Sequence, residues 1–189
     1  MAIDTSDFKT GLTIVQDGEV WRIVEFQHVK PGKGGAFVRS RLQQVKSGKT
    51  VEKTFRAGEK MEQAILERRP MQFLYVADER YTFMDMETFE QTEVGAEVIG
   101  DRGAYLIDGL EVVICWWGEK IMAVDLPTTI ICQVTDTDPG LRGDTASGGS
   151  KPAKIASGAT VTVPLFINVG DVIKVDTRTG QYVERAKAD

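Results

Sequence analysis

A lysine held between glycines is the residue whose type and spacing most strongly suggest a chemical role. Lys33 stands in the segment Lys30-Pro31-Gly32-Lys33-Gly34-Gly35-Ala36, and the flanking runs 20–29 and 37–45 alternate apolar and polar residues. Such alternation predicts two β-strands joined by a short tip. Glycine carries no side chain and permits backbone conformations closed to other residues, so the pattern predicts a lysine that reaches into a crevice of a partner. The alternative is a solvated hairpin tip in which Lys33 serves only solubility.

The charge around this tip is uneven. Residues 21–60 hold 10 basic and 3 acidic residues, whereas residues 65–130 hold 5 and 13, within a net charge of −5. A basic patch confined to one end is typical of a surface that touches phosphate. The candidate phosphate-binding residues are Arg22, His28, Lys30, Arg39, Arg41, Lys53 and Arg56. Chance clustering on a solvated sheet face is the alternative, and His28 has the further alternative of simple packing beside the tip.

One apparent nucleotide motif is a decoy. Ser47-Gly48-Lys49-Thr50 contains the end of a phosphate-binding P-loop, but the first glycine of that motif would fall at Gln43. The motif also needs a following helix, and the next residues, 51–55, are strand-like. We therefore predict a β-turn here.

Residues for catalysis or metal binding are sparse. His28 is the only histidine, and Cys115 and Cys132 form no CxxC pair, so we expect no metal site and no cofactor. The carboxylates of residues 78–101 are scattered, which predicts a solvated acidic face. The two cysteines lie in apolar runs and are expected to be reduced and buried, as in a cytoplasmic protein. We predict no catalytic residue and no enzyme activity.

The elements that must position these residues are almost all short strands. We predict strands at 12–15, 20–29, 37–45, 51–55, 71–76, 80–84, 104–107, 110–116, 120–125, 129–135, 160–164, 172–176 and 181–186. A short helix is predicted over 59–67, where Met61, Ala64 and Ile65 have helical spacing, and a weak turn over 86–91. Many short strands separated by turn signals are typical of small barrels.

The turn signals between strands and a faint internal repeat predict the domain organisation. The segment 109–125 resembles 158–176, since each has a glycine, an alternating strand, a bend and a strand ending in aspartate. We predict three domains, 1–64, 65–128 and 129–189. No apolar run approaches the ~20 residues of a membrane helix, and residues 1–7 lack the features of a secretory signal.

The C-terminal third carries a specific pattern that resembles bacterial elongation factor P. The matching residues are Lys151, Pro152, Ala153, Gly158, Val161, Val163, Pro164, Ile167 and Gly170. The tip Lys30-Pro31-Gly32-Lys33-Gly34 matches as well, with Lys33 at the position of the family's functional lysine. Leu141-Arg142-Gly143-Asp144-Thr145 contains the Gly-Asp-Thr loop of the family's third domain. The likeness covers essentially the whole chain, and the two-domain initiation factor 5A relatives lack the third barrel.

The resemblance implies a fold and a function. The fold is three small β-barrels in an elongated L shape, namely an SH3-like (KOW) domain and two OB-type domains. The function is binding to the ribosome beside peptidyl-tRNA and relief of stalling at consecutive prolines. Gly143, Asp144 and Thr145 are expected to contact RNA on the small-subunit side. The implied partners are the ribosome, peptidyl-tRNA and, if Lys33 is modified, a lysine-modifying enzyme; the protein is expected to be a cytoplasmic monomer with no membrane contact.

Three other classes remain open at this point. One is an elongation factor P-like paralogue, which the fold alone does not exclude, although the intact tip favours the main factor. Another is a KOW/OB nucleic-acid-binding module outside translation, which predicts a basic or aromatic stripe on an OB domain; the acidic middle third counts against it. A barrel enzyme would need a cluster of convergent polar groups, and the sequence displays none.

Overall fold

Strands make up nearly all of the regular structure. The computed structural model describes residues 1–140 and 149–187, and its strands form three separate sheets. The predicted all-β class is confirmed. The chain divides into two compact units, Met1–Arg68 with Ile114–Ala123, and Arg69–Val113 with Val124–Asp189. The three-domain division at 64/65 and 128/129 stays a prediction, which this division into two units does not test.

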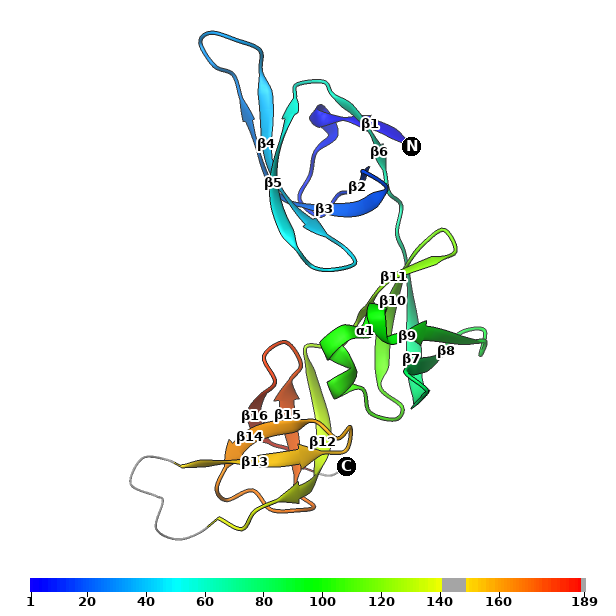
Figure 1. The fold of residues 1–189 in the computed structure, drawn as a ribbon, viewed down its shortest axis with the longest axis vertical. Helices are drawn as coiled ribbons and strands as arrows, with labels where there is room; N and C mark the ends of the chain where they lie inside the picture. The colour runs from blue at the N-terminus through cyan, green and yellow to red at the C-terminus, as the bar shows by residue number, and fades with distance from the viewer. Residues whose placement is uncertain (141–148, 188–189) are drawn as a thin grey trace. The chain divides into compact units, whose positions relative to one another are not determined.

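The first sheet has six strands and curls around its own core (Figure 1). In the order β1-β6-β2-β3-β4-β5 its strands are β1 (Ala2–Asp4), β6 (Lys60–Gln63), β2 (Thr13–Gln16), β3 (Glu19–Val29), β4 (Phe37–Gln44) and β5 (Thr50–Arg56). A short 3-10 helix, η1 (Thr5–Asp7), follows β1. The buried residues of this core are Phe8, Ile14, Ile23, Val38, Leu42 and Phe55.

Strand β3 contains a bulge at Val24. Its register with β4 pairs Ile23 with Leu42 and then resumes with Glu25 opposite Arg41. A bulge adds one residue to one strand, so the residues beyond it change face relative to a regular strand. The bulge therefore decides which side chains of the following hairpin face the core.

The second sheet has five strands in the order β11-β10-β7-β8-β9. These are β7 (Glu67–Ala77), β8 (Arg80–Asp85), β9 (Gln91–Gly95), β10 (Glu111–Trp117) and β11 (Lys120–Asp125). The helical segments α1 (Ala96–Ile99) and η2 (Gly100–Tyr105) follow β9. Phe73 and Phe83 pack together in its interior with ring centroids 5.5 Å apart.

A small second core lies within the first compact unit. Val20, Ala64 and Met122 are buried together, with Leu66 and Trp117 partly buried against them. The β10–β11 hairpin therefore packs on the base of β3, on the side opposite the first core.

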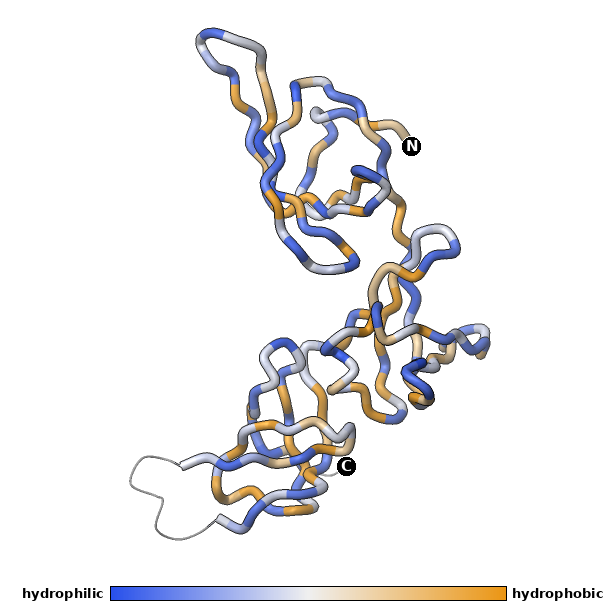
Figure 2. Tube along the Cα trace, viewed as in Figure 1, coloured by the Kyte–Doolittle hydropathy of each residue, from blue (hydrophilic) through white to orange (hydrophobic). Residues whose placement is uncertain are grey.

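The third sheet has the order β14-β13-β12-β15-β16, and its edge strands β14 and β16 approach each other. Its strands are β12 (Thr129–Thr137), β13 (Ser150–Ile155), β14 (Thr160–Pro164), β15 (Val172–Asp176) and β16 (Gln181–Arg185). Figure 2 shows hydrophobic and hydrophilic residues alternating along these strands. Tyr105, Ile107 and Leu110 pack against this core from the preceding segment.

Two sequence-based predictions of local structure are wrong. The predicted helix 59–67 is replaced by β6 and the start of β7, because Lys60–Gln63 pairs with β1 and β2. The predicted strand 104–107 is the end of η2 and the loop after it. Strands β1, β9 and β13 were not predicted.

The cysteines behave as expected. Cys115 and Cys132 form no disulfide and are both buried, as predicted. Burial raises the pKa of the Cys132 thiol to about 11, because an apolar environment disfavours the thiolate. This thiol is inert at neutral pH.

Candidate functional site

The glycine-rich tip connects β3 to β4 and is exposed throughout. The last register pair of the two strands is Val29 with Phe37, and residues 30–36 continue beyond it. Gly34 has φ +104°, a value that side-chain-bearing residues rarely adopt. A Cβ atom at Gly32 would meet nothing within 4 Å. Lys33 is thus an exposed amine on a narrow segment of backbone, as predicted.

Four of the predicted phosphate-binding residues share one face of the first sheet. Arg22 lies opposite Gln43, which is on the face of β4 that also carries Arg39 and Arg41. Arg56 lies opposite Phe37 on the same face. Val38, Ser40 and Leu42, which alternate with them along β4, are buried. The four arginines therefore form one outer face of the β3–β4–β5 sheet.

His28 and Lys53 lie on the other face. Their register partners are Val38 and Ser40, which point into the core. The Lys53 ammonium is 5.6 Å from the centroid of the Phe55 ring, and the His28 ring meets Phe26 edge to face at 5.7 Å. The bulge in β3 hides the position of His28 from the sequence, whereas the three-residue spacing of Lys53 and Arg56 already indicates opposite faces.

The outer face is not uniformly basic. Arg41 lies between Glu25 on β3 and Glu52 on β5. Arg39, two residues nearer the tip, has the neutral partners Gln27 and Thr54. Positive charge is therefore less compensated near the tip than farther down the sheet. A shallow hollow of about 160 Å³ lies between these side chains.

The turn between β4 and β5 holds the P-loop decoy. Gly48 has φ +72°, and its backbone N–H donates to the Gln44 carbonyl at 2.8 Å. Strand β5 follows from Thr50, where a P-loop would have a helix. A turn is therefore present as predicted, but its hydrogen bond joins residues four apart, which makes it an α-turn and not the predicted β-turn. Gly143, Asp144 and Thr145 lie outside the residues that the structure describes.

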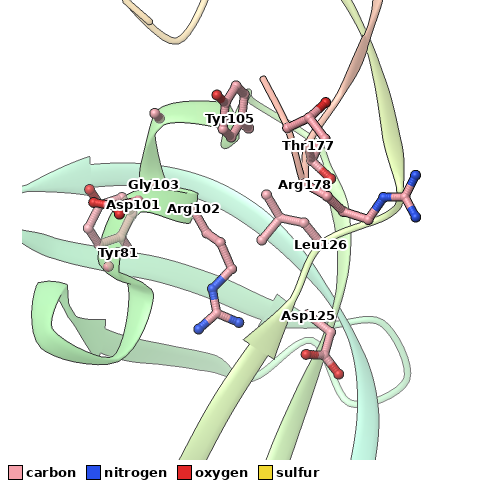
Figure 3. A pocket seen from close by; sticks show the side chains of 12 residues that line it. Tyr81, Asp101, Arg102, Gly103, Tyr105, Asp125, Leu126, Thr177 and Arg178 are labelled. Carbon is pink, nitrogen blue, oxygen red and sulfur yellow. The ribbon is translucent and has the colours of Figure 1, made fainter. Parts of the chain in front are cut away.

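A cavity larger than the hollow beside Arg39 lies in the second compact unit. It measures about 810 Å³ and lies between η2, the end of β11 and the β15–β16 turn (Figure 3). Its two arginines already have protein partners: Arg102 donates to the Val124 carbonyl at 2.8 Å, and Arg178 pairs with Asp176 at 2.7 Å. The sequence could not predict the contact of Arg102, because every residue has a backbone carbonyl and no residue type marks Val124 as the partner. The predicted tip and basic residues are remote from this cavity in the sequence and do not line it.

Metal-binding and membrane-spanning features can be examined over residues 1–140 and 149–187. In that part of the chain no cluster of three or more His, Cys, Asp or Glu side chains could hold a metal ion. None of the helices there has the length and apolar character needed to cross a membrane.

Comparison with known families covers nearly the whole chain. Residues 4–61 match the elongation factor P KOW-like domain, residues 66–124 match the elongation factor P OB domain, and residues 130–185 match the elongation factor P C-terminal domain. The chain belongs to the elongation factor P family. This family consists of translation factors, and the KOW and OB architecture expected from the resemblance is confirmed.

Individual relatives agree with this assignment. Elongation factor P of Gloeobacter violaceus is 54% identical over 184 residues, which cover 97% of this chain and 98% of the relative. Elongation factor P of Acaryochloris marina is 55% identical over 183 residues, covering 97% and 99%. A solved structure, eukaryotic translation initiation factor 5A from Methanococcus jannaschii, superposes with a TM-score of 0.53 at 25% identity, covering 67% of this chain and 92% of that one.

The C-terminal residues that resemble elongation factor P are mostly core residues. Ala153, Val161, Val163 and Ile167 are fully buried in the third sheet. Lys151 is 7% exposed, and its ammonium donates to the Asp138 carbonyl. This part of the family pattern therefore contributes to the core of the third sheet. The Lys33 segment is exposed, and packing does not explain why a lysine stands there.

Proposed function

We propose that this protein binds the ribosome beside peptidyl-tRNA, stimulates peptide-bond formation and relieves stalling at consecutive prolines. The observation that carries the proposal is the exposed Lys33 amine on its glycine-flanked tip. Arg39 and Arg56 lie on the outer face next to this tip, where they can contact tRNA phosphates.

The chemistry fits a factor that orders its substrate. The ring of proline fixes φ and restricts the approach of the reacting groups. Holding two reactants in a productive geometry removes much of the entropic barrier of their reaction. Lys33 can donate charge-assisted hydrogen bonds to the sugar and phosphate groups of the tRNA end. The protein then needs no acid–base group of its own, since the ribosome performs the chemistry.

Further parts of this proposal concern the rest of the chain. We propose three domains with boundaries near residues 65 and 129, a monomeric state and a cytoplasmic location. Gly143, Asp144 and Thr145 are proposed to contact RNA on the small-subunit side. A lysine-modifying enzyme is a partner if Lys33 carries an added group.

The central test replaces Lys33 with alanine. A charge-assisted hydrogen bond contributes about 1.5–3 kcal/mol, so Lys33→Ala should slow Pro-Pro synthesis by about tenfold to hundredfold. The assay is reconstituted translation of a Pro-Pro-Pro message. The matched control is Lys49→Ala, because Lys49 is also an exposed lysine beside a glycine in a hairpin turn of the same sheet. Full activity of Lys33→Ala would refute the proposed function.

A second substitution separates charge from modification. Lys33→Arg keeps the positive charge but cannot accept an amine-specific extension. Full activity of the arginine variant would mean that charge suffices. Loss of activity, together with added mass on the tip peptide of the native protein, would assign the function to a modified Lys33.

A further inference from the structure

Four aromatic rings form a continuous series from the core of the first sheet toward the tip. Phe55 meets Phe8 with centroids 5.5 Å apart, Phe8 meets Phe26 at 6.1 Å, and Phe26 meets His28 at 5.7 Å. The interplanar angles are 84°, 88° and 89°, so each contact is edge to face. Aromatic pairs favour this geometry because the positive edge of one ring meets the negative face of the next.

This ring series has a buried end and an exposed end. Phe55 and Phe8 are 1% and 4% exposed, Phe26 is half-buried and His28 is exposed. The Lys53 ammonium, 5.6 Å from the Phe55 centroid, adds a cation–π contact at the buried end. Val38, the register partner of His28, is completely buried. The ring series therefore joins the rigid core to the part of β3 that leads into the tip.

The tip has few contacts of its own to define its direction. The nearest heavy atom to a Cβ built at Gly34 is Pro31 Cγ at 4.0 Å, and a Cβ at Gly32 or Gly35 would meet nothing within 4 Å. Glycines also have the largest conformational freedom to lose on binding. The order of the tip must come mainly from the strands at its base. Pairing of β3 with β4 ends at Val29 and Phe37, and the Ala36 carbonyl accepts from the Ala57 N–H at 3.1 Å.

We propose that His28 is a positioning residue, which fixes the direction in which the tip leaves the sheet and so presents Lys33 to its target. This inference rests on the proposed function of Lys33. Loss of the His28 ring releases the exposed end of the ring series and lets the base of the hairpin move. A more mobile tip loses more conformational entropy on binding, so the factor binds less tightly. His28 acts through packing of its ring and needs neither of its nitrogens.

The test compares His28→Ala with His28→Phe in the full chain. Backbone ¹⁵N relaxation of Gly32, Lys33, Gly34 and Gly35 reports tip mobility on the free protein, and Pro-Pro synthesis at subsaturating factor reports function. The interaction energy of an aromatic pair corresponds to a change of about two- to tenfold in an equilibrium constant. We therefore expect His28→Ala to lower the tip order parameters and to reduce synthesis about two- to tenfold, while His28→Phe preserves both.

Two further variants keep the result interpretable. Gln27→Ala is the matched control, because Gln27 is exposed on the opposite face of the same strand, opposite Arg39; it should leave tip order unchanged. Phe26→Leu breaks the ring series one step earlier and should mobilise the tip as His28→Ala does.

The possible outcomes separate positioning from direct binding. If His28 binds phosphate through its nitrogens, both His28 variants lose synthesis with unchanged tip order, which would overturn the proposal. Unchanged tip order in His28→Ala would also overturn it, whatever the activity. Because tip order is measured without ribosomes, its result is independent of whether Lys33→Ala supports the proposed function.

Discussion

The hydroxyl of Tyr105 lies against the backbone of Gly180, so close that a Cβ atom added at Gly180 would overlap it. Tyr105 ends η2, and Gly180 lies in the turn between β15 and β16 with φ +68°. Ser157 Oγ also donates a hydrogen bond to the Ala104 carbonyl. Within the second compact unit, η2 is therefore held against the third sheet at two separate points.

Substitution at Gly180 should destabilise this unit. Gly180→Ala introduces both the positive-φ strain and the overlap with Tyr105, so we expect a loss of about 2 kcal/mol or more in the free energy of unfolding. Gly158→Ala is the control, because Gly158 has φ +88° and nothing within 4 Å of an added Cβ; it should cost about 1 kcal/mol. Urea unfolding measures both. Equal losses of unfolding free energy in the two variants would show that the overlap with Tyr105 does not destabilise the Gly180→Ala variant.

Charge reversal on the outer face should weaken ribosome binding. Arg39→Glu and Arg56→Glu remove positive charge close to the tip, and each lost phosphate contact should lower the salt slope of binding by about one. Arg41→Glu should have a smaller effect, since Glu25 and Glu52 already flank Arg41. Sedimentation with ribosomes at several salt concentrations gives the slopes. Lys49→Glu makes the same charge change in the β4–β5 turn, and an equal effect there would contradict a specific outer-face contact.

A glycine at position 89 should stabilise the fold. Phe89 has φ 62° and is 69% exposed. Its backbone is held by Asp85, whose carbonyl accepts from the Phe89 N–H at 3.0 Å. Because a non-glycine residue in the left-handed region costs about 1 kcal/mol, Phe89→Gly should raise the free energy of unfolding by about that amount. Phe89→Ala keeps the strain, and thermal unfolding should place it near the parent protein.

The Asp176–Arg178 pair should contribute stability that depends on pH. The side-chain hydrogen bond from Arg178 is the main cause that lowers the pKa of Asp176 to about 2, compared with about 3.9 in an unfolded chain. A lowered folded-state pKa stabilises the protein above the unfolded value, and this contribution disappears as the pH falls from about 4 to about 2. Asp176→Asn should therefore be less stable than the parent at pH 5 and approach it toward pH 2. A stability difference that stays constant over this range would contradict this.

Local signals explain why much of the fold could be predicted. The period-two alternation of 20–29 and 37–45, and the glycines between them, act over a few residues. The predicted strands 120–125, 160–164 and 172–176 match β11, β14 and β15. Exposure of the Lys33 tip followed from the same signals.

The errors arose where distant partners decide the structure. Met61, Ala64 and Ile65 have helical spacing, but pairing with β1 and β2 from the start of the chain makes 60–63 a strand. In β13 the alternation is hidden, because the buried positions include Lys151 and the exposed ones include Pro152. Propensity is a weak prior against such tertiary contacts.

The sequence singled out candidate residues but not the faces of the sheet on which they lie. Alternation assigns each residue of a strand to a face by its distance from the preceding turn, and nothing in the sequence indicates that Val24 forms a bulge. Alternation from Arg22 therefore puts His28 on the face of the arginines, although the register places it on the opposite side. Lys53 is three residues from Arg56 in β5, so alternation alone already separates these two, and their grouping was an error of the sequence analysis.

The bulge at Val24 also makes the register of β3 part of the information that the strand carries. If Val24 paired with Arg41 in a regular ladder, the two faces would exchange from Glu25 onward, and Gln27 would take the place of the rings of Phe26 and His28. A one-residue slip in β3 would thus resemble several simultaneous substitutions. Deletion of Val24 itself would remove the bulge and leave every later pair as it is. During divergence we therefore expect the chain to accept changes of length at the tip and loss of the bulged residue, but not substitutions that bring Val24 into the ladder.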